Sequence, residues 1–141
     1  MKELFLNYEL SLKLKELGFD ENCFAGYSVL YGSNPPPLIT PTTKNELVPF
    51  YGKYKAQNKH ILKAPLKFQI FDWFRNEHNL ISEIKIDTVY INAKYSYKVI
   101  HKLKIPYLPD LHTYKFDTYE ETELACIEEM MNIIKQKQNE Q

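Results

Sequence analysis

Two amphipathic helices with clear start signals constrain the fold of this chain more than any other feature. We predict the first over residues 65–78, because Pro65 suits the first position of a helix. Its large apolar side chains fall on one arc, with Phe68 alone outside it, so Trp73 and Phe74 are expected in the core. Those on the arc are Leu66, Ile70, Phe71, Trp73 and Phe74. The second helix is predicted over 118–136, where Thr118 and Glu121 form a capping box. Residues 137–141 are then expected to be a frayed tail.

The remaining periodic segments complete a small α+β domain. Asn7 can cap a helix over 8–17, with Gly18 as the left-handed residue after it. A strand is predicted over 23–31. Strict alternation predicts a hairpin of strands 83–91 and 94–103, turning near residues 92–93, with Tyr95, Tyr97 and Val99 toward the core. We therefore expect one domain over 1–141, with a small antiparallel sheet and three helices packed mainly on one face.

A proline-rich stretch over 32–43 interrupts this pattern and predicts an extended surface loop. It is either a plain connector or a docking arm for a partner protein, centred on Pro35, Pro36 and Pro37. The segment that follows carries apolar side chains, Phe50 and Tyr51 among them. These form either a flap over the core or a partner-binding surface, and the sequence leaves both open.

Few residues form a pattern typical of catalysis. The four histidines lie at least eleven residues apart, and neither a CxxC spacing nor a glycine-rich phosphate loop is present. Cys23 and Cys126 have apolar neighbours and are expected to be buried, reduced thiols. We therefore predict no enzyme activity, no cofactor and no metal. With neither a leader-like start nor a long apolar run, we expect no membrane partner and a location in the host cytoplasm or in a particle.

The distribution of lysines is the one charge pattern that suggests a surface. Lys94, Lys98 and Lys102 share strand parity, so with Ser96 they would line the solvent face of the hairpin. They either solubilise that strand or contact nucleic acid weakly. The formal net charge of zero argues against a protein whose main task is coating nucleic acid.

Three sequence blocks, at 12–27, 64–80 and 119–135, resemble a family of small uncharacterised proteins from bacteriophages and prophages of Bacteroidetes-type gut bacteria. The chain differs from that pattern at Asn22, where a proline is usual, and at Ala25, an insertion. The resemblance implies a short α+β protein of mobile-element origin and no specific activity. The expected function is an accessory protein that acts through protein contacts. The alternatives are a minor virion component and a weak nucleic-acid-binding module, and the sequence does not indicate an oligomeric state.

Overall fold

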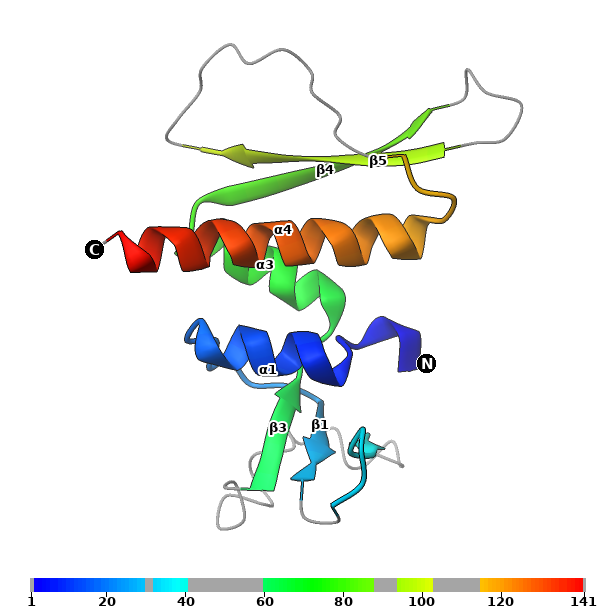
Figure 1. Ribbon diagram of the computed structural model, residues 1–141, viewed down its shortest axis with the longest axis vertical. Helices are drawn as coiled ribbons and strands as arrows, with labels where there is room; N and C mark the ends of the chain where they lie inside the picture. The colour runs from blue at the N-terminus through cyan, green and yellow to red at the C-terminus, as the bar shows by residue number, and fades with distance from the viewer. Residues whose placement is uncertain (1, 30–31, 41–59, 88–93, 103–114, 141) are drawn as a thin grey trace. The chain divides into compact units, whose positions relative to one another are not determined.

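The computed structural model describes residues 2–29, 32–40, 60–87, 94–102 and 115–140, and it confirms the α+β class (Figure 1). The elements in chain order are η1 (Lys2–Leu4), α1 (Tyr8–Glu16), β1 (Ala25–Ser28), β2 (Leu38–Ile39), β3 (Ile61–Ala64), α3 (Lys67–Glu77), β4 (Leu80–Asp87), β5 (Lys94–His101) and α4 (Tyr119–Asn139). The contacts divide the chain into two compact units, Met1–Ile70 and Phe71–Gln141. Each unit has its own antiparallel sheet, where the sequence predicted a single one.

The first unit is built on a sheet of strand order β2-β1-β3, which packs against α1. Tyr27 on β1 lies opposite Leu62 on β3, and both are buried. The Tyr27 hydroxyl donates a 2.8 Å hydrogen bond to the Leu6 carbonyl, so its polar end is satisfied inside the core. β1 is therefore the central strand of this sheet and does not pair with the predicted hairpin.

The predicted signals at the two ends of α1 are confirmed. The Asn7 side chain accepts a 2.9 Å hydrogen bond from the Leu10 amide, as an N-cap should. Gly18 has φ +93°, and its amide donates to the Lys15 carbonyl, while the Phe19 amide donates to the Leu14 carbonyl. This pair of bonds is a Schellman motif, which closes the helix and brings Phe19 into the core.

The structure corrects several predicted boundaries. α3 begins at Lys67, because Pro65 continues from β3 and its carbonyl accepts from the Leu6 amide at 2.9 Å. The proline-rich stretch contains the edge strand β2, whose Leu38 pairs with Tyr27. α4 extends to Asn139, so most of the predicted frayed tail is helical.

The second unit consists of the hairpin β4–β5, the end of α3 and the long helix α4, which runs alongside the hairpin (Figure 1). Thr118 caps α4, because its hydroxyl oxygen accepts a 3.2 Å hydrogen bond from the Glu121 amide. The core side chains are Trp73, Phe74, Leu80, Tyr97, Cys126, Ile127, Met130, Met131 and Ile134. The predicted burial of Trp73 and Phe74 is thus confirmed, and Phe68 is 64% exposed as its position outside the arc required.

The hairpin register differs from the predicted one. Asp87 lies opposite Lys94, so residues 88–93 connect the strands. A turn at residues 92–93 would instead have placed Ile91 opposite Lys94. The difference is four residues, an even number, so the parity of the predicted cross-strand pairing holds for the described residues of both strands.

Candidate functional site

The residues predicted to bind a partner are placed only in part by the structure. Pro35 and Pro37 are exposed, whereas Pro36 is buried and so does not present its ring to a partner. The Pro37 carbonyl accepts a 3.1 Å hydrogen bond from the Ser28 amide, which fixes this stretch to β1. Phe50 and Tyr51 lie outside the described residues. Partner binding by these residues stays a prediction.

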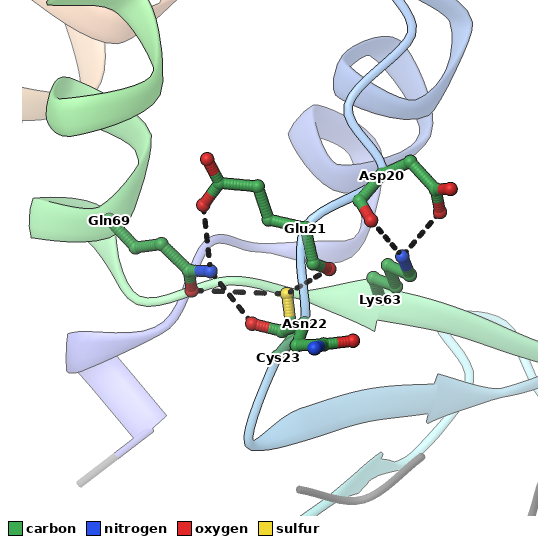
Figure 2. A network of polar contacts seen from close by, with 6 residues as sticks. All are labelled: Asp20, Glu21, Asn22, Cys23, Lys63 and Gln69. Atoms are coloured by element: carbon green, nitrogen blue, oxygen red, sulfur yellow. Dashed lines mark hydrogen bonds and ion pairs between the residues drawn. The ribbon is translucent and has the colours of Figure 1, made fainter. Parts of the chain in front are cut away.

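A polar network holds the turn after α1 in the first unit (Figure 2). Lys63 on β3 contacts Asp20 twice, at 2.7 Å to its carbonyl oxygen and 2.5 Å to its carboxylate. The hydrogen bond and charge of Lys63 lower the pKa of Asp20. Gln69 on α3 donates to the Asn22 carbonyl at 2.8 Å and to the Glu21 carboxylate at 3.1 Å. These contacts give the polar side chains a structural role, because they hold the turn at residues 20–22 against β3 and α3.

A cavity of about 240 Å³ lies beside this turn, lined by Ser11, Lys15, Phe19, Asp20, Ile61, Leu62 and Lys63. Ligand pockets are generally larger, about 300–1,000 Å³. The charge of Lys63 at its rim is already balanced by Asp20. The cavity is therefore a weak candidate for a small-molecule site.

The two cysteines are buried and free of disulfides, as predicted. Burial raises the pKa of the Cys23 thiol and of the Cys126 thiol to about 12 in each case. The Ser82 side chain hydrogen-bonds the Cys126 thiol, which opposes that rise only in part. A nucleophilic cysteine needs the thiolate form, so neither environment favours covalent catalysis.

His78 follows α3 and packs edge-on against Trp73, with ring centroids 4.4 Å apart. Its Nε2 atom is buried and has no hydrogen-bond partner within the part of the chain that the structure describes. Burial lowers the pKa of His78, a shift that Glu77 opposes and Lys137 reinforces. This environment favours the neutral imidazole in the folded protein.

The predicted lysine surface is less basic than the sequence suggested. Lys94 forms an ion pair with Asp117, and Lys98 lies opposite Glu83 across the hairpin. Lys102 is exposed just beyond β5. Ser96 is 5% exposed, so the predicted solvent face is wrong at this position. Acidic groups thus alternate with the lysines, which does not favour a continuous phosphate-binding stripe.

The outer edge of β4 is the best-defined candidate surface. Tyr95 exchanges backbone hydrogen bonds of 2.9 and 2.7 Å with Phe116, so its amide and carbonyl point away from β4. Tyr95 lies opposite Ile86, so this is a non-hydrogen-bonded pair of the hairpin. The backbone groups of Ile86 must then point outward as well. The Lys102 amide, which donates to the Asn79 carbonyl at 2.8 Å, fits the same alternation.

Backbone direction repeats every second residue along a strand. Four residues of β4 therefore direct their amide and carbonyl groups to its outer edge: Leu80, Ser82, Ile84 and Ile86. Among the described residues, no strand pairs with that edge. By contrast, Phe116 occupies the start of the outer edge of β5.

Apolar side chains accompany this edge. Ile86 is 58% exposed, and Tyr119 at the start of α4 is 46% exposed. Tyr95 lies opposite Ile86 and packs edge-on against Tyr119, with ring centroids 6.2 Å apart. An exposed apolar group beside backbone groups that no described strand pairs with is the arrangement that an added strand can cover. The sequence predicted the alternation of side chains along this strand. It did not indicate which edge of the strand has no pairing partner.

No family model, curated protein or solved structure matches this chain. Within the described ranges, no three His, Cys, Asp or Glu side chains group closely enough to hold a metal ion. Nor does any helix in those ranges have the length and apolar character needed to cross a membrane.

Proposed function

We propose that this chain is a non-catalytic protein-binding module that accepts an extended segment as an added strand on the outer edge of β4. The observation that carries the proposal is the row of outward backbone groups at Leu80, Ser82, Ile84 and Ile86. In strand addition, main-chain hydrogen bonds supply affinity and alternate side chains supply selectivity. Ile84 and Ile86 would supply apolar contacts on one face, and Glu83 and Lys85 would supply charged contacts on the other.

The accessory role in a phage or prophage, expected from the resemblance of three sequence blocks, belongs to the same proposal. Such a protein would act in the host cytoplasm or join an assembling particle as a minor component. The raised pKa values of both thiols support the non-catalytic part. Co-purification with particles would favour the structural role over the accessory one.

Amide hydrogen exchange at single-residue resolution tests the proposed edge. In the dilute full-length chain, the amides of Ile84 and Ile86 should exchange quickly, because they point away from β5. The amides of Glu83 and Lys85 serve as matched controls, because they point toward β5 on the same strand and should be protected. Protection of Ile84 and Ile86 in the monomeric chain would mean that the edge is already covered within one chain, and the proposal would fail.

The variant Ile84→Pro extends this test to any partner that is found. It removes an outward amide without removing a hydrogen bond of the hairpin. Partner binding should be lost while the circular dichroism spectrum is kept. Unchanged binding by the folded variant would place the contact elsewhere on the chain.

A further inference from the structure

We propose that the β4 edge binds a second copy of this chain, giving a symmetric dimer whose two β4 strands pair antiparallel about Ile84. This inference rests on the proposed function, because it names the partner of the same edge. It would join the two hairpins into a four-stranded sheet of order β5-β4-β4-β5. Two-fold dimers that reuse one surface are the commonest symmetric assemblies.

Backbone geometry restricts the registers that such a dimer can use. In an antiparallel pair, residues with outward amides must face residues with outward amides. Placing Ile84 opposite Ile84 of the second copy meets this requirement, and Ser82 then lies opposite Ile86 of the second copy. The other allowed registers are reached by sliding the partner strand two residues at a time, and each such shift is one step.

The charges on β4 select among these registers. With Ile84 facing its own copy, Glu83 lies opposite Lys85 of the second copy, and by symmetry the pair occurs twice. One step in one direction places Glu83 opposite Glu83, and one step in the other places Lys85 opposite Lys85. Opposite charges across strands stabilise a pairing and like charges destabilise it. The two side chains already attract each other within one chain, at 3.7 Å, and both are partly exposed.

The second copy would also cover the apolar side chain that the isolated unit leaves in solvent. Ile86, 58% exposed, would lie opposite Ser82 of the partner and diagonal to its Leu80 and Ile84. This burial occurs on the α4 side of the sheet, because Tyr95, which lies opposite Ile86, packs against Tyr119 on α4. The apolar and charged faces of β4 would thus both be complemented.

The position of α4 leaves room for the second hairpin. α4 packs mainly over β5 and less over β4. In the four-stranded sheet the two β5 strands would be three strand spacings apart, about 14 Å at about 4.8 Å each. Packed helices need only about 8–10 Å between their axes. The two α4 helices can therefore lie on one face of the sheet without overlap.

The charge pairs provide a mixing experiment on the full-length chain. Analytical ultracentrifugation at low salt should give the wild type twice the 16.8 kDa mass of one chain. Lys85→Glu and Glu83→Lys should each be monomeric, because each sets like charges opposite one another across the two-fold axis. An equimolar mixture of the two variants should dimerise, because each variant then meets opposite charges at both positions. A monomeric wild type, or variants that dimerise alone as well as the wild type does, would overturn the proposal.

A cysteine placed at the symmetry axis tests the register and does not depend on charge. The two Ile84 Cα atoms would be about 5.5 Å apart, within the about 4.4–6.8 Å that a disulfide spans. Mild oxidation of Ile84→Cys should therefore give a covalent dimer. Ile86→Cys is the matched control: it is more exposed, yet in this register its copies lie about 14 Å apart along the strands. Equal or faster cross-linking of Ile86→Cys would overturn the register.

Hydrogen exchange separates failure of this inference from failure of the proposed function. If the dimer forms, the Ile84 and Ile86 amides should become protected as the wild-type concentration rises, and Lys85→Glu should abolish that change. Fast exchange at every concentration would overturn the dimer and leave an open edge for another protein. Protection of both amides in the monomeric Lys85→Glu variant as well would overturn both, because the edge would then be covered within one chain.

Discussion

Replacing Trp73 with alanine should strongly destabilise the second unit. Trp73 is 5% exposed and packs against Phe74 at 5.3 Å and His78 at 4.4 Å between ring centroids. Truncating a buried Trp or Phe to alanine costs about 3–5 kcal/mol. The edge-on contact with His78 is lost in addition to the buried apolar area, so we expect the free energy of unfolding to fall by about 4–5 kcal/mol. Urea denaturation followed by far-ultraviolet circular dichroism measures this loss, since Trp73 is the only tryptophan and the variant lacks its fluorescence.

Phe68→Ala is the matched control for this substitution. Phe68 lies on the same helix, is 64% exposed, and should cost about 0.5 kcal/mol or less when truncated. Both variants replace an aromatic residue of α3 by alanine, so the difference between their losses of stability reports the burial of Trp73. A loss below about 1 kcal/mol for Trp73→Ala, or equal losses for both variants, would refute the arrangement of the core.

Three further predictions follow from individual side chains. Thr118→Ala should cost about 1 kcal/mol in urea denaturation through loss of the α4 N-cap, and an unchanged midpoint would contradict the cap. Burial lowers the pKa of His78 from 6.5, so the unfolded chain binds the proton more readily, and stability should fall as the pH drops below about 6.5. The fall should be smaller in His78→Gln, and an equal fall would assign it to another group. Thiol labelling of Cys23 and Cys126 at neutral pH should be slow in the folded chain and fast in urea, and fast labelling without urea would contradict their burial.

The features predicted correctly from the sequence are those fixed by neighbours along the chain. Asn7, Gly18 and Thr118 end or begin helices through hydrogen bonds that span only a few residues. The burial of Trp73 follows equally from helical periodicity. Such signals are complete within one segment, so no knowledge of the tertiary arrangement is needed to interpret them.

The predictions that failed depend on pairings between distant segments. β3 is only four residues long and pairs with β1 across more than thirty residues, so no local alternation indicated the separate sheet. The predicted role of Pro65 as a helix start failed because Leu6, far back in the chain, holds its carbonyl in an extended segment. Likewise, Lys94 was expected on a basic surface but is paired with Asp117, 23 residues away. Local composition cannot identify such partners.

The candidate edge combines both kinds of information. Alternation along residues 80–87 indicates which side chains of β4 face α4. The observed register preserves this assignment, because it differs from the predicted one by an even number of residues. The same alternation also decides which amides point outward, but only once one backbone bond has fixed its phase. That bond is the exchange between Tyr95 and Phe116, which lies outside β4 altogether. With the phase fixed, Glu83 and Lys85 on either side of Ile84 form a pattern that complements itself after a two-fold rotation. If β4 were paired on both sides, these residues could not meet a second copy, so the proposed dimer depends on the position of β4 at the edge of its sheet.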